Sequence, residues 1–227
     1  MAMRNSTRKL AVTGMMAAIM IVLGTTPLGF IPIGPFSITI MHLPVIIGAI
    51  LEGPVIGLAL GIFFGLFSLY QAVTAPNILS PLFFDPMVSV VPRAIVGLVA
   101  AYSYLLVEKI FKNRDIRPLA IGDTDGKTKR FFKRAANLFR SNANSLSVAV
   151  SALLSPMTNT VLVLGSIYLF HAASYAEALG ISEGVVAATL LSTAVVNGVP
   201  ECIAAVVVTT AVVLAIKKIK IPRKGAA

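Results

Sequence analysis

Long apolar runs constrain the fold of this chain more than any other feature. The first extends from Leu10 to about Leu28, and most of the later runs are also long enough to cross a ~30 Å hydrocarbon core as a helix. Apolar and polar residues do not alternate along them, as they would in the strands of a membrane barrel. With 57% hydrophobic residues, 12% charged residues and a mean hydropathy of +0.90, the chain is too apolar for a soluble domain.

We therefore expect an all-α membrane protein, in which six transmembrane helices form a single bundle with outer loops rich in Pro and Gly. Residues 1–227 form one integral membrane domain in this interpretation. The helices are expected at about 8–28, 40–52, 54–73, 86–109, 145–171 and 184–218, with a basic loop at 110–144. Pro156 is expected to break the fifth helix, and a polar loop is expected at 172–183.

The basic residues predict which way the bundle is oriented. The net charge of +10 could suggest a nucleic-acid partner, but all lysines and arginines except Arg93 lie in the N-terminal tail, the 109–140 region or the C-terminal tail. An even number of spans places these three segments on one side, which the positive-inside rule makes cytoplasmic. We expect a multi-pass protein of the cell membrane, surrounded by lipid, with both termini cytoplasmic and no nucleic-acid partner.

Two loops rich in Pro and Gly are expected on the outer side. The first, from Thr26 to Ile40, is uncharged, includes a possible extended piece at 36–40, and is a candidate lid. The second, from Thr74 to Pro86, contains Asn77, a candidate substrate contact. His42 begins the second helix, and we interpret it as either a satisfied interfacial residue or a further ligand.

Arg93 is the one basic residue that cannot be placed in water. A cation within the hydrocarbon region usually faces the protein interior and has an anionic partner, so Arg93 either binds an anionic substrate or pairs with another helix. At ~1.5 Å per residue, Arg93, Asn159 and Glu201 lie at one level, roughly 20 Å above the cytoplasmic border, with Asn197 one turn higher. This layer predicts a pocket that opens outward.

Other classes of site find little support in the sequence. We find no nucleophile–base pair, no carboxylate dyad and no metal-ligand spacing, and Cys202, the sole cysteine, excludes an intrachain disulfide. A carrier or binding protein is therefore favoured over an enzyme, with no cofactor or metal. A stand-alone secondary transporter remains an alternative, although the inverted repeat that it predicts is not found.

Small residues share one face of the first helix. Ala11, Gly14 and Ala18 are spaced by three and four residues, so they lie on one side and allow another helix to approach closely. The face either packs within the bundle or forms an interface with a partner. Gly57, Gly61 and Gly65 form a similar face on the third helix, and there we expect close packing.

Several motifs resemble the substrate-binding S components of energy-coupling factor vitamin transporters. They are Arg8–Ala18 (RKLAVTGMMAA), Met41–Ala49 (MHLPVIIGA), Phe64–Ser68 (FGLFS), Pro92–Gly97 (PRAIVG), Thr158–Thr160 (TNT) and Asn197–Glu201 (NGVPE). The last three are most similar to the pantothenate-type branch. The resemblance covers nearly the whole chain except the 112–144 loop.

The resemblance implies a component that captures a B vitamin outside the cell for ATP-driven uptake, together with a transmembrane T component and two cytoplasmic ATPase subunits. Pantothenate would place its carboxylate on Arg93 and its hydroxyls and amide near Asn159, Asn197 and Glu201. Riboflavin, folate or a thiamin precursor are the alternative vitamins. The face at Gly14 and Ala18 corresponds to the family's interface for the T component.

Overall fold

The computed structural model describes residues 2–26, 29–33, 36–111 and 143–219, so most of the basic segment expected at 110–144 lies outside the described residues. The elements in chain order are α1 (Ala2–Thr25), β1 (Phe30–Ile33), β2 (Phe36–Thr39), α2 (His42–Glu52), α3 (Pro54–Thr74), the 3-10 helix η1 (Ser80–Phe84), α4 (Pro86–Ser89), α5 (Val91–Phe111), α7 (Ala143–Leu179), the 3-10 helix η2 (Glu183–Val185) and α8 (Val186–Ile219).

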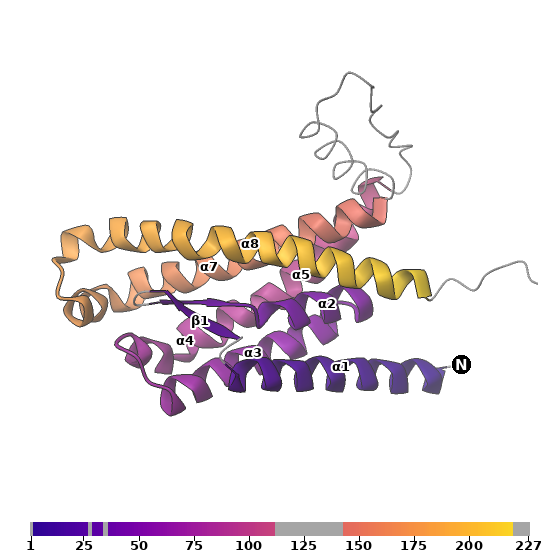
Figure 1. The fold of residues 1–227 in the computed structure, drawn as a ribbon, viewed down its shortest axis with the longest axis horizontal. Helices are drawn as coiled ribbons and strands as arrows, with labels where there is room; N and C mark the ends of the chain where they lie inside the picture. Colours follow the sequence, from indigo (N-terminus) through magenta and orange to yellow (C-terminus); the bar gives the residue numbers. More distant parts are fainter. Residues whose placement is uncertain (1, 27–28, 34–35, 112–142, 220–227) are drawn as a thin grey trace, which may run out of the picture.

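The long helices run roughly side by side along the longest axis of the molecule (Figure 1). The start of α1, the end of α5, the start of α7 and the end of α8 lie toward one end, whereas η1, α4 and η2 lie toward the other. Among the described residues, five helices are long and apolar enough to cross a membrane: α1, α3, the α4–α5 segment, α7 and α8.

The helix expected to span the membrane at 40–52 is shorter than the sequence interpretation assumed. Helix α2 has 11 residues, which at ~1.5 Å each give about 16 Å, roughly half of a ~30 Å hydrocarbon core. It ends because Gly53 takes a positive φ of 94° and Pro54 starts the next helix. Residues 42–50 of α2 are buried, so this short helix lies inside the bundle.

A β-hairpin precedes α2 and departs from an all-α fold. Strand β2 pairs antiparallel with β1, with Phe30 opposite Thr39 and Ile33 opposite Phe36. The extended piece expected at 36–40 is confirmed as β2, but its partner strand was not predicted. Prolines across 27–35 disfavour a helix here, so the backbone forms its hydrogen bonds between two short strands instead.

Glycines on α3 set how closely it approaches α5. A Cβ added to Gly61 would lie 2.3 Å from the carbonyl oxygen of Arg93, and one added to Gly57 would lie 2.5 Å from that of Gly97. A Cβ on Gly65 would lie 2.6 Å from Cα of Val90. The expected close packing of this glycine face is confirmed, and it fixes the backbone that carries Arg93.

The last two helices are longer than expected. Helix α7 continues through Pro156 and past His171, where the backbone kinks (φ −136°, ψ 24°), and reaches Leu179, so the loop expected at 172–183 is mostly helical. It ends at Gly180, whose φ of +63° suits a helix C-terminus. Helix α8 likewise runs continuously through Pro200. The predicted break at Pro156 is therefore wrong, since a proline within a membrane helix can be tolerated without ending it.

The core consists of two apolar clusters. The first joins α1, α2, α3 and α5 around residues such as Met20, Ile46 and Phe64. The second joins η1, α7 and α8 around residues such as Val163 and Ile167. Polar side chains from several helices converge on a cavity that both clusters border, since Phe64 and Val163 also line it.

Candidate binding cavity

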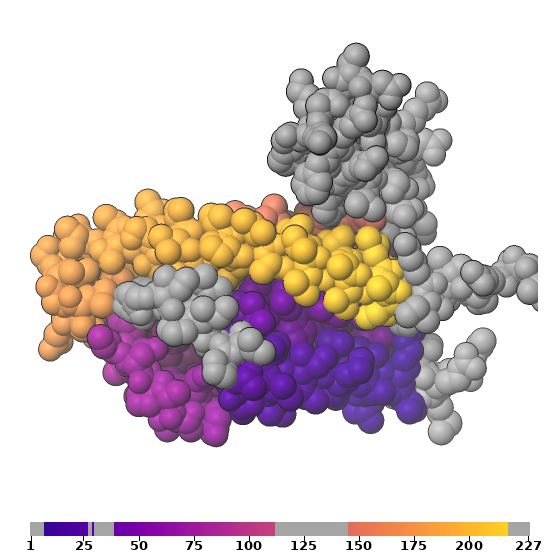
Figure 2. Space-filling view, in the orientation of Figure 1, coloured from indigo at the N-terminus to yellow at the C-terminus, as the bar shows by residue number. Residues whose placement is uncertain are grey.

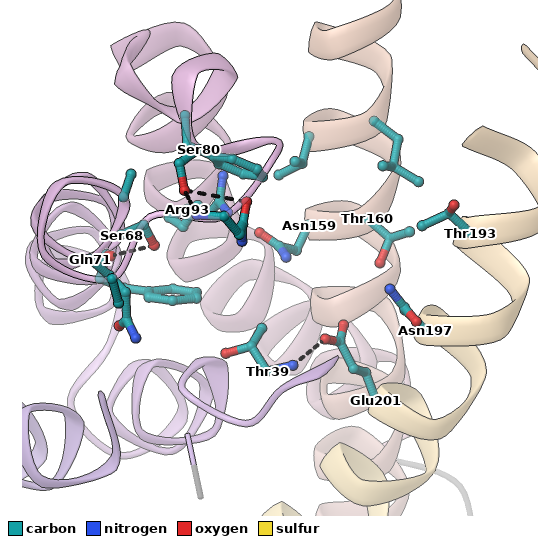
Figure 3. A pocket seen from close by; sticks show the side chains of 17 residues that line it. Thr39, Ser68, Gln71, Ser80, Arg93, Asn159, Thr160, Thr193, Asn197 and Glu201 are labelled. Carbon is teal, nitrogen blue, oxygen red and sulfur yellow. Dashed lines mark hydrogen bonds between the residues drawn. The ribbon is translucent and has the colours of Figure 1, made fainter. Parts of the chain in front are cut away.

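A cavity of about 360 Å³ is lined by 17 residues from β2, α3, η1, α5, α7 and α8 (Figure 3). Its size falls within the ~300–1,000 Å³ typical of sites for small molecules. Five of the six residues predicted to contact a substrate line it. They are Asn77, Arg93, Asn159, Asn197 and Glu201. The structure therefore brings together polar residues that are spread over four segments of the chain.

Arg93 lies near the start of α5, with only 7% of its surface exposed. Its Cζ lies 5.7 Å from the centre of the Phe64 ring and 5.6 Å from that of Phe83, so the cation packs between two aromatic side chains. One terminal nitrogen, Nη1, donates to the carbonyl oxygen of Val88. The Nε donor is buried and has no hydrogen-bond partner in the part of the chain that the structure describes. Arg93 is therefore held in position while its Nε–H remains available to donate a hydrogen bond to a ligand.

Glu201 reaches the cavity from α8, on the side across from Arg93 (Figure 3). Only 4% of it is exposed, and its Oε1 accepts a hydrogen bond of 2.6 Å from the backbone N–H of Thr39. This bond connects α8 to the hairpin. Among the ion pairs of the described residues, none joins Glu201 to Arg93. Each charged group is thus held by neutral partners.

Amide and hydroxyl groups occupy the wall between these charges. Asn159 of α7 is buried, and its Oδ1 has no hydrogen-bond partner among the described residues. Asn197 of α8 is half-buried and lies near Thr160 and Thr193 in Figure 3. Such groups supply both donors and acceptors to a polar ligand.

Asn77 is committed mainly to the local structure of its loop. Its Oδ1 accepts a hydrogen bond of 2.9 Å from the N–H of Leu79, while its own N–H donates to Ser80 Oγ at 2.7 Å. This is the usual turn chemistry of asparagine. Asn77 therefore shapes the rim of the cavity.

His42 is the predicted substrate contact that the structure leaves outside the cavity lining. It is fully buried at the start of α2, and neither ring nitrogen has a hydrogen-bond partner among the described residues. Its two interpretations, as an interfacial residue and as a further ligand, both stay predictions.

Sequence reasoning missed several lining residues, including Phe64, Phe83 and Gln71. Phe64 gave no signal because it lies in an apolar run, where it is indistinguishable from a core residue, and Phe83 lies in the expected outer loop, where nothing marks it as facing a ligand. Gln71 could have been found, since it is a polar residue near the end of the apolar run 54–73. Its Oε1, like Oδ1 of Asn159, is buried and has no hydrogen-bond partner among the described residues.

Outside the cavity, Asp85 and His171 hold the η1–α4 segment against the kink of α7. His171 Nε2 lies 2.9 Å from Asp85 Oδ2, and Asp85 Oδ1 accepts a 2.8 Å hydrogen bond from the N–H of Met87 at the start of α4. The Met87 N–H, and then the His171 bond, lower the pKa of Asp85. The pair supports the segment that carries Phe83.

The small residues of α1 point away from the bundle. Ala11, Gly14 and Ala18 are exposed, whereas Met16 and Met20 on the opposite side of the helix are buried. A Cβ added to Gly14 would meet nothing within 4 Å. Helix α1 forms one edge of the molecule (Figure 2), so this face is not used for packing within the described chain.

Comparisons with known proteins identify the family to which this chain is similar. Residues 8–213 match the family described as "ECF transporter, substrate-specific component". The chain is similar to the pantothenic acid transporter PanT of Lactococcus lactis subsp. cremoris, with 30% identity over 95% of the chain and 96% of that protein. It is also similar to the pantothenate transporter PanT of Leuconostoc mesenteroides subsp. mesenteroides, with 33% identity over 54% of the chain and 62% of the relative.

Proposed function

This chain belongs to the family of substrate-specific components of ECF transporters, and from that premise we propose that it binds pantothenate and presents it for import. As a member of this family it is a transport protein and not an enzyme. Support for the substrate comes from the two similar pantothenate transporters and from the chemistry of the cavity.

The observation that carries the proposal is the unpaired guanidinium of Arg93. It is buried, it forms no ion pair with a carboxylate among the described residues, and its Nε donor is unused. A buried cation of this kind is costly unless an anion joins it. The carboxylate of pantothenate supplies that anion and can accept two hydrogen bonds from the planar guanidinium.

The remaining groups of pantothenate also find chemically suitable neighbours. Its amide and two hydroxyls need both donors and acceptors, which Asn159, Asn197 and Glu201 provide along the cavity wall. Its two methyl groups need an apolar surface, which Val163 and Leu164 of α7 offer. The cavity thus pairs one cationic end with a mixed polar and apolar wall.

The proposal includes an orientation and a set of partners. Both termini and the 110–144 segment face the cytoplasm, because the basic residues gather there, and the cavity opens toward the outside. A transmembrane T component and two cytoplasmic ATPases supply the energy for uptake. The exposed face of Ala11, Gly14 and Ala18 on α1 is where we place the T component, because small residues permit close helix contact.

Titration calorimetry with the purified full-length protein tests the substrate directly. Pantothenate, riboflavin, folate and a thiamin precursor are each titrated, with β-alanine included as a fragment that carries the carboxylate alone. We expect a saturable heat with pantothenate and much weaker binding of the others. Tight binding of another vitamin with none of pantothenate would contradict the proposed substrate while leaving the family assignment intact.

A further inference from the structure

The cavity contains two ionisable side chains, and their charges balance. Of the 17 lining residues, Arg93 and Glu201 can carry a full charge, and the rest are apolar or neutral polar. With both ionised, the empty cavity holds one positive and one negative charge. An anionic ligand therefore changes the net charge of a buried site.

The two charges are held apart by separate partners. Arg93 is fixed by the carbonyl of Val88 and by two aromatic rings, whereas Glu201 is fixed by the N–H of Thr39. They interact electrostatically across the cavity without forming an ion pair. The guanidinium can therefore accept a second carboxylate without first releasing Glu201.

Adding that second carboxylate leaves two negative charges facing one positive charge. This step rests on the proposed function, because it requires the ligand to be an anion. Like charges that share a site with little water cannot both remain ionised, and one of them takes up a proton. Arg93 stays charged, and it neutralises the ligand that it contacts. Glu201 has no such cation in contact, so it is the group that becomes neutral.

We infer that Glu201 is a proton-binding site coupled to the anion site, so that pantothenate enters the cavity together with one proton. Oε1 is already engaged by Thr39, which leaves Oε2 to carry the proton. A protonated carboxyl is also a donor, so Oε2–H can then donate to a ligand hydroxyl. With pantothenate bound and Glu201 protonated, the cavity again holds one positive and one negative charge, as it does when empty.

Among the described residues, few other groups near Glu201 can titrate. Strand β2 contributes Thr39, and the lining residues of α7 are all uncharged. The remaining ionisable neighbours are His42 of α2, three residues beyond Thr39, and Cys202, next to Glu201 on α8. Arg93 faces Glu201 from α5 across the cavity. The pair formed by Asp85 and His171 lies outside the lining.

Calorimetry in paired buffers measures the proton directly. Pantothenate is titrated into the full-length protein in phosphate and in Tris at each pH between roughly 6 and 8.5, well above the ~4.3 expected for the ligand's own carboxyl. The difference in apparent enthalpy gives the protons taken up per ligand. We expect an uptake approaching about one proton, and a dissociation constant that rises by up to about tenfold per pH unit where uptake is largest.

Two comparisons assign the proton. Glu201→Gln retains an acceptor for the Thr39 N–H but cannot titrate, so we expect no proton uptake and a dissociation constant that does not change with pH. Pantothenol has an alcohol in place of the carboxylate and adds no charge, so its binding to the wild type should take up no proton. If Glu201→Gln fails to fold, the pantothenol comparison still shows whether the uptake depends on the ligand's charge, and retained uptake in His42→Gln excludes the rival site. Cys202→Ala is a control that should retain the uptake.

The outcomes separate this inference from the function on which it rests. Pantothenate binding without proton uptake at any pH would overturn the inference and leave the proposed function intact. Uptake that persists in Glu201→Gln and disappears in His42→Gln would assign the proton to His42 and also overturn it. Absence of pantothenate binding would contradict the proposed function and the inference with it.

Discussion

At the residue scale, the cavity stands out for buried polar atoms that lack partners. Nε of Arg93 and Oδ1 of Asn159 are both buried and find no hydrogen-bond partner among the described residues, a condition that usually costs free energy in a folded protein. Arg93 and Glu201 do not neutralise each other by direct contact, so the interpretation of Arg93 as part of a purely structural ion pair loses its support. A ligand that supplies an anion and a donor would satisfy both atoms.

Asn159→Ala tests this interpretation on a neutral group. Because Oδ1 has no partner among the described residues, its removal should leave the melting temperature nearly unchanged. The same change should weaken pantothenate binding by about threefold to tenfold, the range for one lost hydrogen bond. Calorimetry and a thermal melt measure the two effects.

Ser151→Ala on the same helix is the matched control. Its hydroxyl donates a 2.6 Å hydrogen bond to the carbonyl of Ala100, so its loss should lower stability by about 0.5–1 kcal/mol and leave affinity unchanged. If Asn159→Ala instead destabilises the protein and retains full affinity, Asn159 is a structural residue.

The polar members of the cavity could be identified from the sequence because they interrupt apolar runs. Arg93, Asn159 and Glu201 are rare residue types in such surroundings, and helical rise places them at one level. The apolar members could not, because Phe64 and Phe83 become ligand-facing only through tertiary packing. His42 could not be placed from the sequence either, because its burial at the start of α2 depends on tertiary packing.

At the element scale, the α3–α5 contact sets the position of Arg93. Gly61 approaches the backbone of Arg93 so closely that no side chain fits between them. Glycines spaced four residues apart predicted that α3 packs closely against another helix. Only the folded chain shows that this helix is α5 and that Gly61 lies against the backbone of Arg93. Local sequence also could not reveal that β1 pairs with β2, or that α7 continues through Pro156.

Gly61→Ala is expected to disturb both packing and binding. The new Cβ would lie 2.3 Å from the Arg93 carbonyl oxygen, so α5 must shift, at a cost of about 1–3 kcal/mol. We expect a lower melting temperature and a higher dissociation constant for pantothenate. Gly165→Ala on α7 is the control, because a Cβ there meets nothing within 4 Å. Wild-type melting and binding in Gly61→Ala would show that the close contact does not position Arg93.

At the scale of the whole molecule, one exposed face has no use within the described chain. Ala11, Gly14 and Ala18 face away from the bundle on α1, which is itself tied to the α2–α3 turn by a 2.6 Å ion pair between Arg8 and Glu52. The sequence indicated the face but left open whether it packs internally. The structure leaves it free to contact a partner.

Gly14→Leu and Ala18→Leu test this face. A bulky side chain should hold another helix away, so assembly with a T component and uptake of labelled pantothenate should be lost. Binding by the isolated protein should persist, because α1 does not line the cavity. Ala211→Leu, at an exposed position on α8, is the matched control and should retain uptake. Normal uptake by the two α1 variants would exclude this interface.

The orientation of the molecule can be tested by labelling. In a Cys202→Ala background, a cysteine at the exposed Ser174 near the end of α7 should react with an impermeant reagent added to intact cells. A cysteine at Ser141, in the basic segment, should be protected until the membrane is opened. Labelling at 141 but not at 174 would reverse the proposed topology.

The central claim is that Arg93 holds the carboxylate of pantothenate, and calorimetry with two ligands and two proteins tests it most directly. Wild type and Arg93→Met are each titrated with pantothenate and with pantothenol. We expect Arg93→Met to weaken pantothenate binding by roughly thirtyfold or more, in line with ~2–5 kcal/mol for a buried charged contact, and to leave pantothenol binding nearly unchanged.

Arg93→Lys should restore only part of the loss, because it cannot form two parallel hydrogen bonds. If Arg93→Met alone does not fold, the double variant Arg93→Met/Glu201→Gln, which removes both charges, takes its place. The decisive quantity is the ratio of the pantothenate dissociation constants of variant and wild type. If Arg93 binds the carboxylate, this ratio should be about thirty or more. A well-folded variant that binds pantothenate as tightly as the wild type would contradict it.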